Sequence, residues 1–178
     1  MRPVVIAVVG GKKSGKTTAI EILIKKLAER GHKIAAIKHI PEPNFTIDQE
    51  GKDTWKYAQA GATEIIGVSA HEIVTIEKTD FKKELLTEIL RKCRKNDVVF
   101  LEGFKDLIAR NKSIFKIVVL NSERQAAEDL KVFEPILAFT GPYHLENSGK
   151  RPSYVDILKS PDKLADLIEK LIPRRAAT

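Results

Sequence analysis

The sequence predicts an α/β protein in which helices cover both faces of a mainly parallel sheet. Short β-branched runs alternate along the chain with longer segments of helical apolar spacing, and no internal repeat interrupts this alternation. The 178 residues, of which 43% are apolar, suffice for one domain with a full hydrophobic core. We therefore expect a single domain over residues 1–173 and a frayed tail at residues 174–178.

The first elements follow from apolar spacing and turn residues. Residues 3–9 form a continuous β-branched run, which is typical of a strand buried on both faces. Over residues 16–30 the apolar side chains recur every three or four positions, which predicts an amphipathic helix that Gly31 ends. Residues 33–38 predict a strand that should run beside the first, and the polar stretch 39–51 after it is too long for an ordinary connector.

The middle of the chain adds an antiparallel feature. Residues 52–60 have the spacing of a short helix, which Gly61 ends. Segments 64–69 and 72–77 are apolar strands joined by a tight turn, which predicts a hairpin. The next apolar stripe, over residues 81–93, again has helical spacing.

The last third of the chain completes the expected sheet. Three runs of β-branched and aromatic residues predict strands at 97–101, 115–120 and 135–140. A polar helix is expected near residues 122–130, and Ser160 followed by Pro161 marks the start of the final helix. The apolar stripe of this last helix consists of Leu164, Leu167, Ile168, Leu171 and Ile172.

Charge and cysteine content narrow the function classes. The net charge of +7 suits anionic partners, but the lysines are scattered and only 6% of residues are aromatic, unlike a nucleic-acid surface. The single cysteine, Cys93, allows no internal disulfide and fits a reducing compartment. No apolar stretch approaches the roughly 20 residues of a membrane span. We expect a cytoplasmic protein that binds neither nucleic acid nor membrane.

The segment GGKKSGKTT carries the most specific chemistry in the sequence. Its glycines let backbone N–H groups point at phosphate oxygens, and the helix that follows presents its positive end to the same anion. Lys16 would supply charge to the β and γ phosphates, and the Thr17 hydroxyl would bind Mg²⁺. The strand–loop–helix setting predicts a P-loop NTPase fold with three α/β/α layers. The expected nucleotide-binding residues are Gly10, Gly11, Lys12, Lys13, Ser14, Gly15, Lys16, Thr17 and Thr18.

Acidic residues are expected near this loop. Glu102 follows a buried apolar run, so it should lie at the carboxyl edge of the sheet and serve the magnesium ion or its water. Asp97, at the start of the same run, should lie at the far edge and be structural. Asp48 and Asp53 could bind metal or position water, although a solvated loop acid fits each equally well. His39 could face the site or serve packing.

Several linked motifs resemble the molybdopterin-guanine dinucleotide biosynthesis protein B (MobB) family of P-loop GTPases. Their order and spacing agree with this family from the first strand to about Leu120. Besides the phosphate loop, the motifs are Ile37-Lys38-His39, Asp48 with Gly51-Lys52-Asp53, Ala60-Gly61-Ala62, and Glu102-Gly103-Phe104-Lys105. The loop after His39 and residues 141–152 depart from the family pattern, which affects partner contacts more than nucleotide binding.

The resemblance implies a GTP-binding accessory protein with weak magnesium-dependent GTPase activity, often a homodimer. It would assist a molybdopterin guanylyltransferase (MobA-like) that attaches GMP to molybdopterin, and molybdopterin would be a further ligand. The product would be the dinucleotide form of the molybdenum or tungsten cofactor. By position, Thr17 and Glu102 would serve the magnesium. Lys38, His39, Asp48, Lys52, Asp53 and Lys105 would line the adjoining surface.

These considerations give one set of candidate site residues. The candidate catalytic residues are Lys16, Glu102 and Asp53, the candidate metal ligands are Thr17, Glu102 and Asp48, and Lys38 and His39 join the loop as nucleotide-binding residues. Without an evident arginine finger or water-positioning glutamine, we expect slow intrinsic hydrolysis.

Two other functions use the same loop. A small-molecule kinase usually needs an arginine-bearing lid, and the arginines at 91, 94, 110 and 124 lie in no convincing lid segment. A nickel-insertion GTPase or related metallochaperone carries clustered Cys and His ligands. This chain has one cysteine and four separated histidines, at positions 32, 39, 71 and 144.

The choice of base follows from the resemblance alone. Many GTPases read guanine with Asn-Lys-x-Asp after a late strand, but Asn111-Lys112 lacks the Asp and precedes a strand here. Asn121 and Thr140 are expected at strand ends from which they could reach a base.

Overall fold

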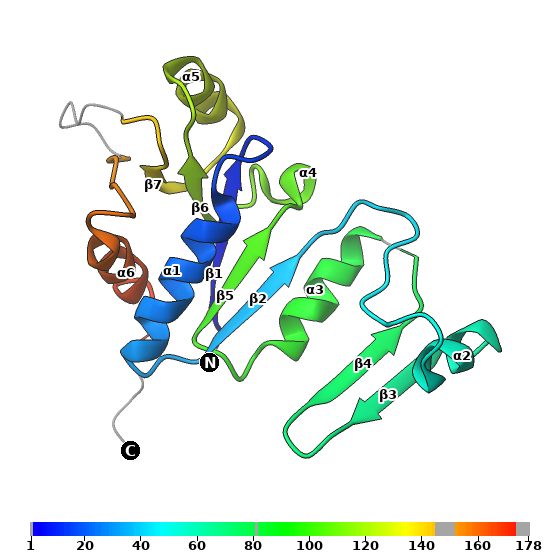
Figure 1. Ribbon diagram of the computed structural model, residues 1–178. Coiled ribbons are helices and arrows are strands. Elements are labelled where there is room, and N and C mark those ends of the chain that lie inside the picture. The colour runs from blue at the N-terminus through cyan, green and yellow to red at the C-terminus, as the bar shows by residue number, and fades with distance from the viewer. Residues whose placement is uncertain (1, 81, 145–151, 174–178) are drawn as a thin grey trace. The chain divides into compact units, whose positions relative to one another are not determined.

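The computed structural model describes residues 2–80, 82–144 and 152–173, which form two compact units (Figure 1). The larger unit contains residues 1–39 and 86–178, and the smaller one contains residues 40–85. The expected tail at 174–178, and Phe81 at the start of one apolar stripe, lie outside the described residues. No helix in the described part is long and apolar enough to cross a membrane.

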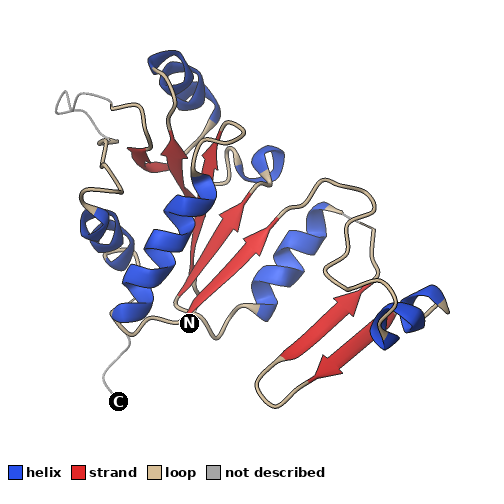
Figure 2. Ribbon diagram, in the orientation of Figure 1, coloured by secondary structure: helices blue, strands red, loops and turns tan. Residues whose placement is uncertain are grey.

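The larger unit is built on a five-stranded parallel sheet with the order β2-β5-β1-β6-β7. Its strands are β1 (Val4–Gly10), β2 (Ile34–Lys38), β5 (Val98–Glu102), β6 (Ile114–Val119) and β7 (Ile136–Thr140). Figure 2 shows helices on both faces of this sheet. The predicted fold class, an α/β fold with a mainly parallel sheet and an antiparallel hairpin, is confirmed, and the hairpin forms a sheet of its own.

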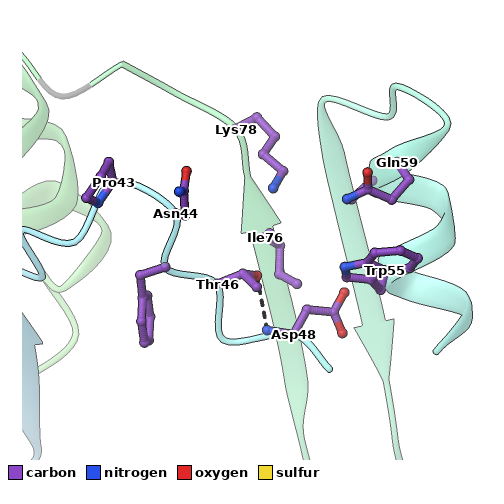
Figure 3. Close-up of a pocket in the computed structure, with 10 residues that line it drawn as sticks. Pro43, Asn44, Thr46, Asp48, Trp55, Gln59, Ile76 and Lys78 are labelled. Carbon is purple, nitrogen blue, oxygen red and sulfur yellow. Dashed lines mark hydrogen bonds between the residues drawn. The ribbon is translucent and has the colours of Figure 1, made fainter. Parts of the chain in front are cut away.

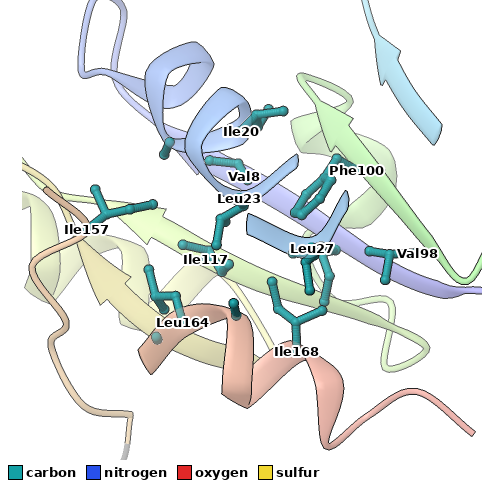
Figure 4. Packing of buried hydrophobic residues seen from close by; sticks show 14 of the residues in the cluster. Val8, Ile20, Leu23, Leu27, Val98, Phe100, Ile117, Ile157, Leu164 and Ile168 are labelled. Atoms are coloured by element: carbon teal, nitrogen blue, oxygen red, sulfur yellow. The ribbon is translucent and has the colours of Figure 1, made fainter. Parts of the chain in front are cut away.

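Two helices cover one face of the sheet, α1 (Lys16–Glu29) and α6 (Pro161–Glu169). Their apolar stripes meet alternate residues of β1 in one core cluster (Figure 4). Leu23 and Leu27 of α1, like Leu164 and Ile168 of α6, have no exposed surface. Because these side chains recur every three or four residues, the whole apolar face of each helix reaches the sheet.

The other face is covered by α3 (Lys83–Lys92), α4 (Lys105–Ile108) and α5 (Glu123–Val132). Ala7 of β1 and Leu101 of β5 pack here beside Phe104 and Ile108. Consecutive residues of a strand point to opposite faces, so a strand covered on both sides must be apolar throughout. The continuous apolar runs of β1 and β5 therefore follow from their central positions.

The prediction that the strand at residues 33–38 runs beside the first strand was wrong. β5, not β2, pairs with β1 on that side, and β2 is the edge strand beyond β5. The burial of the two strands explains the order. Residues 98–101 of β5 are fully buried, whereas Ala36 and Lys38 of β2 are exposed. A strand with polar or small residues on its outer positions is suited to the edge of a sheet.

Two elements were not predicted from the sequence. Helix α4 is a single turn, and Tyr154 forms an isolated parallel bridge to Phe139 on the outer side of β7. The Phe139 N–H donates to the Ser153 carbonyl at 3.0 Å, and the Val155 N–H donates to the Phe139 carbonyl at 2.8 Å. The last helix is also shorter than expected: it ends at Glu169, so Leu171 and Ile172 follow it but still pack on the core.

The smaller unit consists of α2 (Asp53–Gln59) and an antiparallel hairpin of β3 (Glu64–Val68) and β4 (Ile73–Glu77). The predicted hairpin is therefore confirmed. Within the described part of this unit, Ile65 is the one apolar side chain that is fully buried.

Candidate functional site

The loop between β1 and α1 depends on two glycines in left-handed conformations. Gly10 has a φ of +150° and Gly15 a φ of +95°. A Cβ atom on Gly10 would lie 2.6 Å from the Val119 carbonyl oxygen and 2.9 Å from Ser14 Oγ. Any side chain at position 10 would therefore collide with the end of β6 and with the loop itself. The loop can curl at the carboxyl edge of the sheet because that space is left open.

The start of α1 presents unpaired donors to the same place. Its N-cap residue is Gly15, which has no side chain to cap the helix, and its first turn contains no acidic residue. The first N–H groups of a helix have no partner within the helix and carry partial positive charge. Ser14 is buried, and its Oγ has no hydrogen-bond partner within the described part of the chain. These donors are arranged to receive an anion.

Lys16 extends back across the loop. Its Nζ donates to the Gly11 carbonyl oxygen at 2.6 Å. This hydrogen bond to the backbone holds the ammonium at the loop, on a flexible stem that can turn toward a phosphate oxygen. Lys12 and Lys13 of the same loop are exposed.

Thr17 and Glu102 meet although 85 positions separate them in the sequence. Glu102 ends β5, in register with Val8 on one side and Lys38 on the other. The Thr17 hydroxyl donates to the Glu102 carboxylate, with both oxygens 3.2 Å away, and Lys38 Nζ lies 3.4 Å from Oε1. The structure therefore brings together a hydroxyl, a carboxylate and an ammonium at one edge of the phosphate loop.

His39 continues β2 past this carboxylate. Its N–H donates to the Glu102 carbonyl at 2.9 Å, and its ring lies 5.2 Å from the Phe104 ring. Gly103 has a φ of +92°, and a Cβ there would lie 2.9 Å from the Cβ of His39. His39 therefore packs against the turn that carries Glu102. Its expected contact with nucleotide stays a prediction.

Three further residues considered in the sequence, Lys105, Asp97 and Thr140, make contacts with other parts of the larger unit. Lys105 Nζ lies 5.5 Å above the centre of the Phe133 ring. Asp97 is structural, as expected, because its carboxylate accepts the Lys33 N–H at 2.8 Å at the opposite edge of the sheet. Thr140 is buried, and its hydroxyl accepts the Ile157 N–H at 3.3 Å, so that oxygen is already engaged.

Asp48 and Asp53 belong to the smaller unit. Asp48 Oδ1 accepts hydrogen bonds from the Thr54 hydroxyl and the Gln49 N–H, both at 2.9 Å. Asp48 borders a cavity of about 310 Å³ that also contacts Trp55 (Figure 3). Asp53 pairs with Lys56 on an exposed helix face at 3.2 Å. The roles expected for both aspartates in metal binding and catalysis stay predictions, because the phosphate loop belongs to the larger unit.

The two alternative functions, a small-molecule kinase and a metallochaperone, would require an arginine-bearing lid and clustered metal ligands, respectively. Arg110 donates to the Lys131 carbonyl at 3.0 Å, and Arg124 pairs with Glu128 on the exposed side of α5 at 2.9 Å. Burial raises the pKa of the Cys93 thiol. Among the described residues no three His, Cys, Asp or Glu side chains are grouped so as to hold a metal ion.

Sequence reasoning missed a cleft beside the loop. It has a volume of about 260 Å³ and is bordered by Thr18 of α1, by Gly141 after β7, and by Asp156 to Leu158. These segments are distant in the sequence and carry no motif. The isolated bridge between Tyr154 and Phe139, and the hydrogen bond from the Ile157 N–H to the Thr140 hydroxyl, hold the last of them beside the end of β7.

Residues 5–140 match the family model described as "Molybdopterin guanine dinucleotide synthesis protein B". The chain is 30% identical to the "Molybdopterin-guanine dinucleotide biosynthesis adapter protein" of Haemophilus influenzae, over 92% of this chain and 86% of that protein. A "Probable molybdopterin-guanine dinucleotide biosynthesis adapter protein" of Bacillus subtilis is 33% identical over 71% and 70% of the two chains. The crystal structure of Bacillus subtilis MobB is similar with a TM-score of 0.71 and 25% identity, covering 96% and 99%.

Proposed function

This chain belongs to the molybdopterin guanine dinucleotide synthesis protein B family, and from this premise we propose that it is a GTP-binding adapter protein. It assists a guanylyltransferase partner in attaching GMP to molybdopterin, and it hydrolyses GTP only slowly. The names of its relatives, molybdopterin-guanine dinucleotide biosynthesis adapter proteins, support the pathway and the adapter role. The single observation that supports nucleotide binding most strongly is the contact between Thr17 and Glu102 beside the curled phosphate loop.

The phosphates bind at the loop, where several hydrogen-bond donors converge. The triphosphate replaces the Gly11 carbonyl as the partner of the Lys16 ammonium, and it accepts hydrogen bonds from the free N–H groups at the start of α1. The buried Ser14 hydroxyl, which lacks a partner within the described part of the chain, donates to the same anion. Each of these groups exchanges a weak or missing partner for a charged one.

Thr17 and Glu102 fit a magnesium ion. Mg²⁺ in nucleotide sites commonly takes one or two protein oxygens and completes its shell with phosphate oxygens and water. The Thr17 hydroxyl and the Glu102 carboxylate, 3.2 Å apart, are two such oxygens at the edge of the loop. When bound, the ion neutralises charge that develops on the phosphates. Lys38, 3.4 Å from Glu102, limits the excess negative charge at this point.

We expect slow hydrolysis because fast phosphoryl-transfer enzymes place an arginine or a water-positioning glutamine against the transferring phosphate. Among the described arginines, Arg110 donates to the Lys131 carbonyl and Arg124 pairs with Glu128. GTP binding therefore acts chiefly as a signal or a source of substrate for the partner, in keeping with an adapter. A turnover number of about 10 s⁻¹ or more, typical of complete enzymes, would contradict this proposal.

The hairpin supports association of two copies of the chain. Ile66, Val68 and Ile73 lie on one face of the hairpin and are 57%, 74% and 71% exposed. Neighbouring exposed apolar side chains on one sheet face are typical of an interaction surface. We assign this face, which we call the hairpin face, to a homodimer contact.

The test is a titration of GTP, with magnesium, into the wild-type protein and the variant Lys16→Ala. We expect about a 100-fold loss of affinity or more, because the variant removes a charged hydrogen-bond donor from the phosphates. Lys25→Ala is the matched control, since Lys25 is exposed on the same helix. Unchanged affinity in Lys16→Ala, with an unchanged circular dichroism spectrum, would overturn nucleotide binding at this loop.

The adapter role is tested with the partner present. The rate at which a guanylyltransferase attaches GMP to molybdopterin is measured with wild-type protein, with Lys16→Ala and without either. We expect stimulation by the wild type only. Equal rates in all three reactions would refute the adapter role while leaving the nucleotide site intact.

A further inference from the structure

The cleft beside the phosphate loop lies where a bound nucleotide would place its base. Loop residues Ser14 and Gly15, together with Thr18 of α1, form one wall of the cleft. The opposite wall follows β7 and the segment that bridges to it at Tyr154, and parallel strands present their carboxyl ends at one common edge. A triphosphate held by the loop therefore has its nucleoside end directed along an edge where this hollow already exists.

The size and lining of the cleft suit one aromatic heterocycle. Its volume of about 260 Å³ is below the roughly 300–1,000 Å³ of pockets that enclose a whole small molecule. Pro142, Ile157 and Leu158 supply an apolar surface, and Leu158 is 74% exposed. A flat base lying on these side chains would remove that apolar surface from water. Ile157 also belongs to the core cluster, in which Figure 4 labels it.

The far wall is fixed before any ligand arrives. The Tyr154 hydroxyl donates to the Gly141 carbonyl at 2.6 Å, and the Ile157 N–H donates to the Thr140 hydroxyl at 3.3 Å. Gly141 has a φ of +116°, and a Cβ there would lie 2.7 Å from the Leu120 carbonyl oxygen. These bonds join the segment at residues 154–157 to Thr140, the last residue of β7, and to Gly141 after it. A preformed cleft binds without the cost of ordering its walls.

Asp156 gives this wall a hydrogen-bonding preference. Its Oδ1 accepts the N–H groups of Leu158 and Lys159 at 3.0 and 3.2 Å, which holds the carboxylate in a turn. Its Oδ2 lies 3.7 Å from Lys159 Nζ, an exposed and loosely held partner. An ionised carboxylate accepts about four hydrogen bonds and donates none. Asp156 lines the cleft, and its Oδ2, paired with Lys159 Nζ at 3.7 Å, retains acceptor capacity. Such a carboxylate favours a ligand edge that carries N–H donors.

The Watson–Crick edge of guanine meets this requirement and that of adenine does not. Guanine presents a ring N–H and an exocyclic NH₂ side by side, and one carboxylate can accept from both. Adenine presents one NH₂ beside a ring nitrogen that is itself an acceptor, which would face the carboxylate without a proton between them. Leaving such acceptors unmatched in a binding site costs affinity.

We propose that this cleft receives the base of the bound nucleoside triphosphate and that Asp156 selects guanine over adenine. This inference rests on the proposed nucleotide-binding function and adds the residue that determines its specificity. It would also account for a preference for GTP without an Asn-Lys-x-Asp motif, because the acceptor comes from the segment that follows the bridge between Tyr154 and Phe139.

The test compares GTP, ATP and xanthosine triphosphate binding to the wild type and to Asp156→Asn. Xanthine carries an oxygen where guanine carries its exocyclic NH₂, so it complements an amide better than a carboxylate. We expect the wild type to prefer GTP over ATP by about 10-fold or more. Asp156→Asn should lose about 10-fold or more in GTP affinity and bind xanthosine triphosphate more tightly than the wild type does. The matched control is Asp106→Asn, because Asp106 is exposed on α4.

Inorganic triphosphate separates this inference from the proposed function. Asp156→Asn should bind inorganic triphosphate as the wild type does, whereas Lys16→Ala should lose it. If Asp156→Asn keeps the wild-type order of the three nucleotides, the base assignment is overturned and the phosphate site stands. If Lys16→Ala still binds GTP fully, the proposed function itself fails.

A second variant covers the case in which Asp156→Asn does not fold. Leu158→Ser leaves the carboxylate in place and removes an exposed apolar contact. We expect it to weaken GTP and ATP binding by a similar factor of about 5, with inorganic triphosphate unaffected. Unchanged affinity for both nucleotides in Leu158→Ser would place the base outside this cleft.

Discussion

The sheet of the larger unit and the hairpin of the 40–85 unit are both built from β-branched strands, but they differ in what covers them. The central strands β1 and β5 have helices on both faces, and most of their side chains are fully buried. In the hairpin one side chain, Ile65, is buried, whereas the hairpin face, Ile66, Val68 and Ile73, is more than half exposed. Similar local sequence thus gives a core in one unit and an open surface in the other.

This comparison indicates that the two units differ in stability. An isolated two-stranded hairpin is at best marginally stable in water, and it needs further strands or a helix against it. Here α2 is the helix that contacts β3. We therefore expect the larger unit to hold most of the free energy of unfolding and the smaller unit to open first.

The largest effect is expected from Leu23→Ala in the core of the larger unit. Leu23 has no exposed surface and lies between α1 and the sheet (Figure 4). Its truncation should lower the free energy of unfolding by about 3–5 kcal/mol, through lost burial and the cavity left behind. Urea denaturation followed by far-ultraviolet circular dichroism measures this loss. A loss below about 1 kcal/mol would mean that this core does not dominate stability.

The next effect concerns Lys116, a lysine with no exposed surface on β6. Its Nζ donates to the carbonyls of Asn111 and Glu134 at 2.8 and 2.6 Å. Burial lowers the pKa of Lys116 to about 8, although attraction to Glu134 partly opposes this shift. The unfolded chain, with an ordinary lysine pKa near 10.4, therefore binds more protons than the folded chain between about pH 8 and pH 10.4.

Stability contributed by this lysine should thus rise with pH through that window and be lost as pH falls through 8. Relative to Lys116→Met, the wild-type free energy of unfolding should increase by up to about 3 kcal/mol between pH 7.5 and pH 10.5. Urea denaturation of both proteins at a series of pH values measures the difference. Parallel curves would show that the buried ammonium titrates normally.

Lys116 also shows where sequence reasoning stops. The run FKIVVL predicted a strand, and β6 is there, but nothing in the run indicates that its lysine is buried. The two carbonyls that stabilise it come from loops whose positions depend on the whole fold. A sequence pattern reports which residues share a face, whereas the partner of a buried polar group is set by tertiary contacts.

The candidate site likewise has features that the sequence predicts and features that depend on tertiary contacts. The loop, Thr17 and Glu102 were predictable because strand ends and a phosphate motif define one edge of a parallel sheet. The order of β2 and β5 was not, since both follow helical crossovers and only their relative burial separates them. Asp156 was missed because an isolated bridge, from Tyr154 to Phe139, places its segment, and a single bridged residue gives no periodic signal in the sequence.

A smaller effect is expected from Ile65→Ala in the 40–85 unit. The chain has one tryptophan, Trp55, which lies in α2 of this unit, so its fluorescence reports local opening there. We expect the fluorescence transition to precede the circular dichroism transition in urea. Ile65→Ala should move only the fluorescence transition, by about 1–2 kcal/mol, because a small core collapses around the lost side chain more easily than a large one. Coincident transitions that move together would show one cooperative unit.

The smallest effect is expected from Val68→Ser on the hairpin face. Val68 is 74% exposed, so in dilute protein the substitution should change the free energy of unfolding by no more than about 0.5 kcal/mol. At higher concentration the same variant should weaken the proposed homodimer, measured by sedimentation velocity, because a hydroxyl then replaces an apolar contact. Thr75→Ser, on the same hairpin face, is the control that keeps a polar group polar. A decrease of more than about 1 kcal/mol in the free energy of unfolding of dilute Val68→Ser would mean that Val68 is buried within a single chain. The contrast between a covered sheet and an open hairpin would then fail.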